Sequence, residues 1–223
     1  SFDVEKMIDQ VDRLVDEQFM DRFNKDRKSF ESGKNLLSYT MAKSLTKRVL
    51  KKEIEFLRKQ SEPVFIEYLE LKIKLPIELK IAGEVKNIQL SGVIDRIDSI
   101  GGNYRIVVYK SGKVKESEAE ITLGGKETDL LKIVGSTKHA LQLAMYSFMF
   151  REHFGFPAKE VGLLSLINVS KGLIALKDKN GNDLNAITDR FPEFLSLLLE
   201  IMYDENQPFS HKAQQFSYCT YCK

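Results

Sequence analysis

Apolar residues recur every three or four positions in four long segments, which is the spacing of amphipathic helices. These segments are residues 2–24, 35–60, 137–154 and 184–203. Between the second and the third, the period changes to two. Residues 64–82 alternate apolar and charged side chains, as half-buried strands do. Pro76 falls inside this stretch, so we expect a bend or an edge position there.

The stretch Gln89–Lys113 follows directly and has the pattern of a β-hairpin. Its first run ends in Asp95-Arg96-Ile97-Asp98, a Gly101-Gly102-Asn103 turn follows, and the second run leads to Lys110. Residues 161–176 add two more short strands. The order of helices, antiparallel strands, helix, strands and helix predicts a mixed α/β (α+β) domain with a central sheet flanked by helices.

A length of 223 residues fits one domain with a helical appendage. We expect residues 1–60 to form an N-terminal helical segment packed on a core of residues 61–223. Residues 113–135 have no clear period and contain Gly124-Gly125. This segment is therefore predicted to be a long connection, of the kind that often carries function.

Composition excludes several classes of protein. A hydrophobic fraction of 43% and a charged fraction of 30% are typical of soluble globular domains. No apolar run reaches the ~18 residues that a membrane-spanning helix needs, so no membrane partner is expected. Only two cysteines are present, Cys219 and Cys222. This scarcity argues against a disulfide-stapled secreted fold and favours a cytoplasmic location.

The net charge of +2 gives no global field that would direct the chain to nucleic acid. The basic residues are nevertheless concentrated on the second predicted helix and after the central hairpin. They are Lys43, Lys47, Arg48, Lys51, Lys52, Arg58, Lys59, Lys110, Lys113 and Lys115. Any one of them is ordinarily solvated surface. Together they could contact a phosphate backbone.

The predicted hairpin brings Asp95 and Lys110 together from opposite strands. A carboxylate that holds a divalent ion and a lysine that stabilises charge suit metal-assisted phosphodiester cleavage. The ordinary alternatives are a turn cap, a surface pair, or an ion pair that satisfies a buried strand without catalysis. Val108 stands two positions before Lys110, where this chemistry requires a second acid.

Other candidate residues lie on the third predicted helix and at the C-terminal end. Gln142 and Tyr146 are four apart and share a helix face, either as surface residues or as contacts to Lys110 or a substrate. His139, one turn earlier, is a weak candidate for a general base or metal ligand. The three histidines are scattered, so no zinc-type cluster is evident.

Taken together, the motifs resemble the RecB-like branch of the PD-(D/E)XK nuclease superfamily. That family has Gly-x-x-Asp-Arg-x-Asp, then an apolar strand ending in Asp-Tyr-Lys-(Thr/Ser)-Gly, then Gln-Leu-x-x-x-Tyr on a helix. This chain has, in the same order, Gly92-Val93-Ile94-Asp95-Arg96-Ile97-Asp98, Val108-Tyr109-Lys110-Ser111-Gly112 and Gln142-Leu143-Ala144-Met145-Tyr146. Ser217-Tyr218-Cys219-Thr220-Tyr221-Cys222 is similar to the start of the family's Cys-x-x-Cys segment. The resemblance covers residues 60–223 and implies a restriction-endonuclease-like core.

The resemblance also implies roles for individual residues. It assigns Asp95 to a metal, Mg²⁺ or Mn²⁺, Lys110 to catalysis, and Gln142 and Tyr146 to support of the substrate or active site. It departs at Val108, where the family has its second metal carboxylate. Further acids that could serve are Asp98, Glu67 and Glu70, with Glu53 and Glu55 as stand-ins for the family's helical ligand. Cys219 and Cys222 supply only two of the four ligands of an iron–sulfur or zinc site, so such a site is unsupported.

The function implied by the resemblance is a DNA exonuclease of repair or recombination, partnered by a helicase or another subunit of a repair complex. Val108 leaves an alternative, a catalytically inactive nuclease-fold domain that serves as a DNA-binding or structural module of a helicase–nuclease complex. A third hypothesis is a plain α/β interaction domain without nuclease ancestry. In such a domain we expect Asp95 and Lys110 to point apart.

Overall fold

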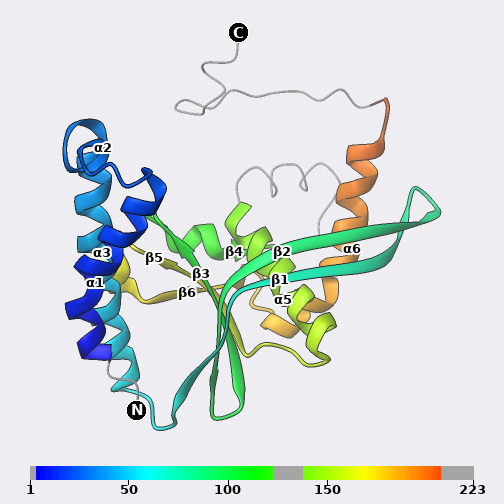
Figure 1. Cartoon of the computed structure of the whole chain (residues 1–223). Coiled ribbons are helices and arrows are strands. Elements are labelled where there is room, and N and C mark those ends of the chain that lie inside the picture. Colours follow the sequence, from blue (N-terminus) through cyan, green and yellow to red (C-terminus); the bar gives the residue numbers. More distant parts are fainter. Residues whose placement is uncertain (1–3, 123–137, 207–223) are drawn as a thin grey trace.

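The computed structural model describes residues 4–122 and 138–206 (Figure 1). The helices are α1 (Val4–Arg22), α2 (Lys28–Glu31), α3 (Leu36–Leu57), α5 (Lys138–Phe154) and α6 (Leu184–Tyr203), with short 3-10 turns at Gly33–Asn35, Glu116–Ala119 and Val169–Lys171. The strands are β1 (Val64–Ile81), β2 (Glu84–Ile100), β3 (Asn103–Lys110), β4 (Glu120–Ile121), β5 (Glu160–Ser165), β6 (Leu173–Ala175) and β7 (Lys177–Asp178). The four long helices begin and end within a few residues of the predicted bounds. In the described part of the chain, none of the helices has the length and apolarity required to cross a membrane.

One five-stranded sheet, in the order β1-β2-β3-β5-β6, forms the centre of the domain. Strands β1, β2 and β3 are consecutive and antiparallel, as the hairpin pattern predicts. Strand β5 runs parallel to β3, and α5 lies on the crossover between them, because parallel neighbours require a long connection. The mixed α/β class predicted from the pattern is therefore confirmed.

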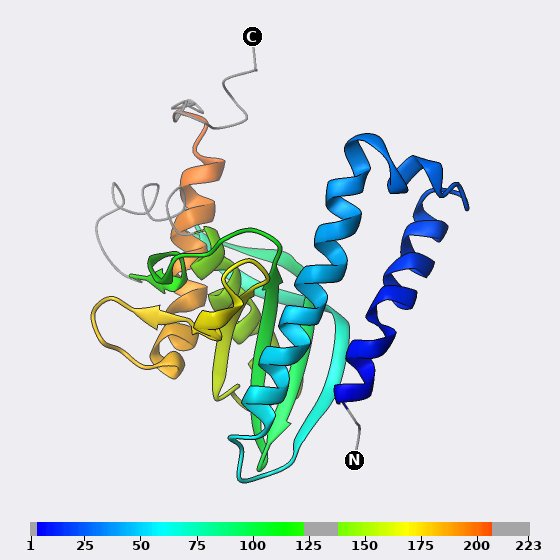
Figure 2. The same ribbon diagram turned by 90° about the vertical axis from the view of Figure 1, so that its left-hand side faces the viewer.

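The two faces of the sheet are covered by different helices. Figures 1 and 2 show α5 and α6 on one face and α3 crossing the other. The α5 side carries the main core, in which Ile97, Leu143 and Phe150 are fully buried. The α3 side carries a smaller cluster of Val107, Leu164 and Val169, with Val49 of α3 packed against it.

Strand β1 is the edge of the sheet and is 18 residues long, with a shift in its pairing register between Ile66 and Tyr68. Pro76 keeps its place in the ladder, opposite Gln89. An edge position tolerates this proline because its missing N–H can be on the solvent side. Of the two positions predicted for Pro76, a bend or an edge strand, the edge strand is confirmed. The bend in the sheet lies at other residues.

The bend is at Glu70 of β1 and Asp95 of β2, which lie opposite each other. Two pairings flank them, Leu69 with Arg96 and Leu71 with Ile94. Glu70 has a φ of 51°, which is uncommon for a residue other than glycine. Ile94 and Ile97 are three residues apart, yet both are fully buried in the same core, which the two-residue alternation of a regular strand does not allow. The alternation of side chains therefore resets at Asp95.

A buried polar network joins α3 to the middle of the sheet. Asp98 has 0% of its surface exposed and accepts bonds from Arg96 Nε and from an Arg105 terminal nitrogen, each at 2.5 Å. A terminal nitrogen of Arg96 also donates to Glu53 Oε2 of α3 at 2.9 Å, and the other donates to the Tyr109 hydroxyl at 3.1 Å. Two carboxylates and two guanidinium groups thus neutralise one another in the interior, as buried charges require.

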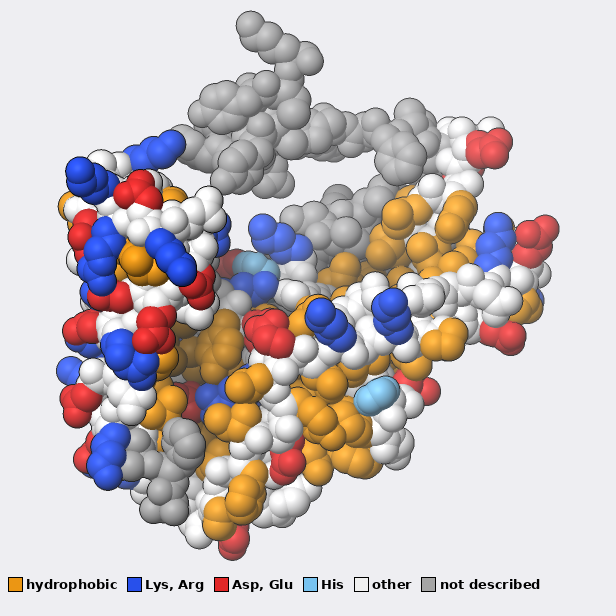
Figure 3. Space-filling model, viewed as in Figure 1, with side chains coloured by type: hydrophobic (Ala, Val, Ile, Leu, Met, Phe, Trp, Pro, Cys, Tyr) orange, Lys and Arg blue, Asp and Glu red, His pale blue; other side chains and the backbone are white. Residues whose placement is uncertain are grey.

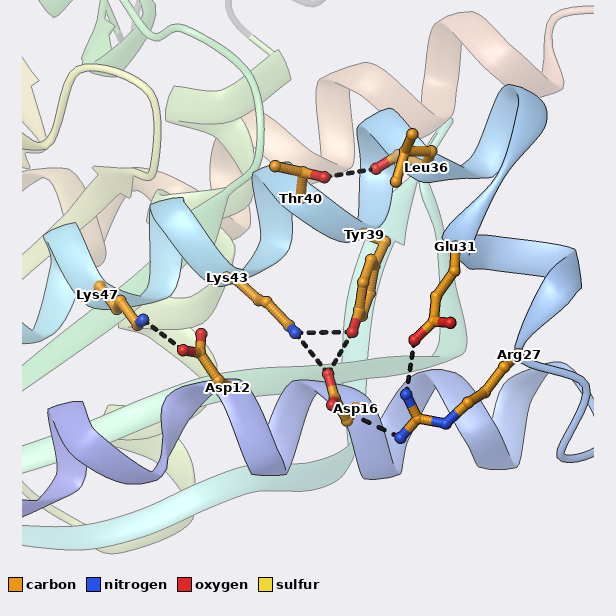
Figure 4. A network of polar contacts seen from close by, with 9 residues as sticks. All are labelled: Asp12, Asp16, Arg27, Glu31, Leu36, Tyr39, Thr40, Lys43 and Lys47. Carbon is orange, nitrogen blue, oxygen red and sulfur yellow. Dashed lines mark hydrogen bonds and ion pairs between the residues drawn. The ribbon is translucent and has the colours of Figure 1, made fainter.

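Helices α1 and α3 form a hairpin whose facing side chains carry opposite charges. Lys43 Nζ lies 2.6 Å from Asp16 Oδ1, and Lys47 Nζ lies 2.7 Å from Asp12 Oδ2 (Figure 4). The hydroxyl of Tyr39 also donates to Asp16, at 2.5 Å. Hydrogen bonds from Lys43 and Tyr39 hold the pKa of Asp16 below its usual value. Part of the basic side of α3 is therefore neutralised by α1.

Replacing Asp98 should destabilise the fold strongly. In Asp98→Ala, Arg96 and Arg105 would lose the carboxylate between them while remaining buried, so we expect the free energy of unfolding to fall by about 3–5 kcal/mol. Asp12→Ala is the matched control, because it breaks an exposed ion pair and should cost about 0–1 kcal/mol. Urea unfolding of both variants measures the difference. Equal and small losses would show that the buried network does not hold the sheet to α3.

Candidate functional site

Asp95 lies beside the end of β3. Its Oδ2 atom accepts the backbone N–H of Tyr109 at 2.7 Å. The antiparallel pairing of β2 with β3 ends at Arg96 opposite Val107. Continuing that register places Asp95 opposite Val108. The reset of alternation at Asp95 thus directs its carboxylate to the neighbouring strand, where a side-chain oxygen takes over a backbone hydrogen bond.

Lys110 ends β3 and reaches toward α5. Its Nζ donates to Gln142 Oε1 at 2.7 Å, and Gln142 Nε2 donates to the Tyr146 hydroxyl at 3.1 Å. Burial lowers the pKa of Lys110, and the nearby charge of Asp95 acts in the opposite direction. The two strands and the helix that carry the three sequence motifs therefore meet at one place, and Asp95 and Lys110 interact electrostatically.

Gly92, the first residue of the central motif, allows α5 to approach closely. A Cβ atom built on Gly92 would lie 2.8 Å from Cε1 of the Tyr146 ring. Contacts below 3.0 Å are not tolerated, so any side chain here would displace the ring. The glycine of the first motif and the tyrosine of the last are thus in direct contact, which spacing along the sequence does not reveal.

Val108 occupies the position opposite Asp95, and only 2% of its surface is exposed. It belongs to the main apolar core together with Ile97, Ile106 and Leu143. The side chain of valine has no atom that can ligate a cation. The site therefore has one carboxylate at this pair of positions instead of two.

The other acids proposed from the sequence lie in several different environments. Asp98 and Glu53 are both committed to Arg96, in the network on the α3 side of the sheet. Glu67 is exposed and accepts a hydrogen bond from the Ser99 hydroxyl. Asp98 and Glu53 are thus neutralised away from Lys110.

Glu70 and Glu55, two further acids considered from the sequence, are both exposed. Glu70 is exposed and lies opposite Asp95 at the bend. Glu55 is exposed on α3 and pairs with Lys52 at 2.7 Å, which lowers its pKa. Cys219 and Cys222 lie outside the described residues. Among the acids considered from the sequence, Glu70 is the one opposite Asp95.

A carboxylate–imidazole pair adjoins the site. The sequence pattern indicated its histidine but not its carboxylate. His139 Nδ1 lies 3.0 Å from Glu118 Oε2. His139 precedes Gln142 by one helical turn, so both side chains are on the same side of α5. Glu118 falls in the connection for which the sequence pattern predicted no regular structure. The local sequence around Glu118 does not predict its contact with His139, because the two residues are 21 positions apart and meet only in the folded chain.

The surface around the site is concave. Figure 3 shows a hollow between the α1–α3 hairpin and the β1–β2 strands, with Lys, Arg and His side chains gathered in it. The charges of Lys110 and Lys138 both lower the pKa of His139. The hollow therefore offers positive charge close to the site.

The described residues offer few side-chain ligands for a divalent metal. Within residues 4–122 and 138–206, no group of three or more His, Cys, Asp or Glu side chains is placed to hold an ion. Asp95 is a single carboxylate, and one of its oxygens already accepts the Tyr109 N–H. Mg²⁺ in enzymes is commonly held by one or two carboxylates together with waters and substrate phosphates, so Asp95 would have to share an ion with such ligands.

Comparison with known proteins gives one result. A sequence profile described as the PD-(D/E)XK nuclease superfamily matches residues 3–223. The match spans both the helical hairpin and the sheet. No curated protein matches the sequence.

The Gly92 contact leads to a paired prediction. Gly92→Ala should lower the free energy of unfolding by about 1–3 kcal/mol, because the added methyl group overpacks against Tyr146. Gly112→Ala is the control, since a Cβ there meets no atom within 4 Å. We expect the control to change stability by no more than about 0.5 kcal/mol. Urea unfolding compares them, and equal stabilities would contradict the close approach of β2 to α5.

Proposed function

Since the chain belongs to the PD-(D/E)XK nuclease superfamily, we propose that it is a RecB-like domain that binds DNA without cleaving it. The observation that carries this proposal is Val108. It is buried in the apolar core opposite Asp95, at the position where RecB-like enzymes have their second metal carboxylate. The mixed five-stranded sheet with helices on both faces is consistent with the restriction-endonuclease-like fold.

Loss of one carboxylate weakens the binding of the metal ion on which hydrolysis by these enzymes depends. Nucleases of this superfamily generally use divalent metal ions, and a metal positions the nucleophile and offsets the charge of the reacting phosphate. Charge and ligand number set the affinity of an oxygen site for such ions. Asp95 alone supplies one negative charge, and the Tyr109 N–H competes for one of its oxygens. No catalytic step is therefore assigned to a bound metal.

The residues that remain are suited to contact a phosphate backbone. Lys110 lies at the end of β3 and donates to Gln142, which in turn donates to the Tyr146 hydroxyl. Basic side chains lie in the hollow beside it, with acidic side chains at its edge (Figure 3). By contrast, Lys43 and Lys47 of α3 are paired with α1. Binding of DNA would thus depend on the hollow and not on these two lysines, through release of counterions from phosphates.

The biological setting follows from the RecB-like resemblance. RecB-like domains occur in helicase–nuclease subunits that repair or recombine DNA, so we place this domain in such a complex, with a helicase or another subunit as partner. A domain that binds DNA but does not cut it would hold one strand or the duplex for an active partner. This role requires the fold and the positive hollow and does not require the metal.

One observation favours a second candidate function, hydrolysis with a displaced acid. Glu70 lies opposite Asp95 at the bend, is exposed, and has an unusual backbone φ of 51°. Strained conformations of this kind are concentrated at functional sites. If Glu70 replaced the acid missing at Val108, it would join Asp95 as a ligand of Mg²⁺ or Mn²⁺, with Lys110 stabilising the charge of the reacting phosphate.

The two functions make opposite predictions in a cleavage assay. We expect the wild-type chain to bind single-stranded or duplex DNA in EDTA, and to cleave neither with Mg²⁺ or Mn²⁺. Lys110→Ala should weaken binding and reduce the slope of log K against log salt by about 0.7 for single strands, as for one lost phosphate contact. Lys28→Ala on α2 is the control. Metal-dependent cleavage lost in Asp95→Asn and Glu70→Gln, but kept in Glu78→Gln, would establish the second candidate instead.

Restoring the missing acid tests the assignment of the site. Val108→Asp would place an uncompensated carboxylate in the core and should lower the free energy of unfolding by about 3 kcal/mol. Mn²⁺ at about 100 times its Kd should return about 2.7 kcal/mol, because the new carboxylate and Asp95 would share the ion. Val108→Asn should be destabilised without any response to metal. A folded Val108→Asp variant that Mn²⁺ does not stabilise would show that Asp95 and Val108 are not the metal positions.

A further inference from the structure

Glu118 holds His139 in a defined orientation. One carboxylate oxygen, Oε2, lies 3.0 Å from His139 Nδ1, and the other, Oε1, accepts the backbone N–H of Lys115 at 3.0 Å. Because both oxygens are engaged, the carboxylate cannot rotate freely. A carboxylate accepts and does not donate, so Nδ1 carries the proton. The second ring nitrogen, Nε2, is therefore the one left to meet a ligand or solvent.

His139 stands among cations. Burial lowers its pKa, the charges of Lys110 and Lys138 lower it further, and Glu118 acts in the opposite direction. Among residues 4–122 and 138–206, these are the charged groups that act on the ring, from β3, from α5 itself and from the 3-10 turn that carries Glu118. The side chain remains 19% exposed, and that of Glu118 remains 32% exposed, so solutes can reach the pair.

We propose that Nε2 of His139, with Lys138 and Lys110, receives one backbone phosphate of bound DNA, and that His139 takes up a proton as the phosphate binds. This site deepens the DNA-binding function proposed above and rests on it. His139 and Lys138 lie outside the three nuclease motifs, and the contacts of Glu118 are what orient His139 toward a ligand. The ligand class is a phosphodiester anion.

The charges explain why phosphate and proton bind together. With the ring protonated, three cationic groups would crowd one another, and Glu118 offsets only the Nδ1 side. A phosphate oxygen at Nε2 supplies the missing negative charge and converts Nε2 into a donor of a charge-assisted hydrogen bond. Bound phosphate therefore raises the pKa of His139 above its value in the free protein.

The sign of the pH dependence follows directly. Above the pKa of the DNA-bound form, His139 is neutral with and without DNA, so affinity does not depend on its protonation. Between the bound and the free pKa values, each complex takes up a proton, and affinity rises up to tenfold for each unit that the pH falls. Below the free value, which lies under the ordinary histidine pKa, the ring is charged in both states and the dependence ends.

The test is DNA binding by the full chain at several pH values. A fluorescent single-stranded oligonucleotide and its duplex are titrated in EDTA from about pH 8 to about pH 5.5, which brackets the ordinary pKa of histidine. We expect wild type to bind more tightly as pH falls, and His139→Gln to lose that component while keeping its affinity at high pH. His153→Gln is the matched control, because His153 lies on the same helix and packs against the Phe154 ring.

Two further variants separate the phosphate contact from a structural role of the ring. Glu118→Gln keeps a hydrogen-bond acceptor but removes the charge, so the rise in affinity should begin at a lower pH. Lys138→Ala should lower the salt slope by about 0.7 for single strands, whereas Lys28→Ala should not. If the DNA affinities of His139→Gln and Glu118→Gln depend on pH as that of wild type does, this inference is overturned. The proposed DNA-binding function would not be affected by that result. Absence of DNA binding by wild type at every pH would overturn the proposed function itself.

Discussion

The buried ion network around Asp98 is the interaction on which the arrangement of this domain depends. Asp98 joins Arg96 of β2 to Arg105 of β3, and Arg96 continues the connection to Glu53 of α3. Charges buried this deeply are stable only when every partner is present. The network therefore fixes the helical hairpin against one face of the sheet, and it fixes the register of the two strands that carry Asp95 and Lys110.

The two acids in the middle of β2, Asp95 and Asp98, lie in different environments. Asp98 is neutralised in the interior, whereas Asp95 lies at the bend and takes a backbone hydrogen bond from Tyr109. They differ because the side-chain alternation resets between Ile94 and Ile97. In a regular strand the side chain of Asp95 would stand perpendicular to the sheet instead of reaching the backbone of β3. The bend is thus what puts a carboxylate beside the lysine.

Charge pairing divides the basic residues into structural and available groups. Lys43 and Lys47 complete the α1–α3 hairpin, where acids of α1 neutralise them (Figure 4). Lys110, Lys138 and His139 instead crowd one end of the sheet, and the pKa values of Lys110 and His139 are lowered. Cations held together in this way favour an anion over a metal ion. With Val108 in place of an acid, we propose that the site holds phosphate and not a divalent cation.

The sequence by itself determined the elements and the motifs. Periodic apolar residues located the four long helices because a helix must bury one face along its whole length. Strand alternation and the glycine turn located the β2–β3 hairpin, and motif order indicated the nuclease superfamily that the profile match supports. Only the tertiary structure decided the contacts between distant elements. The bend at Glu70 and Asp95, the pairing of α3 lysines with α1, the packing of Gly92 on Tyr146 and the Glu118–His139 pair all join residues whose local sequence is unremarkable. Local patterns report which face of an element is buried, whereas partner identity depends on how the elements pack.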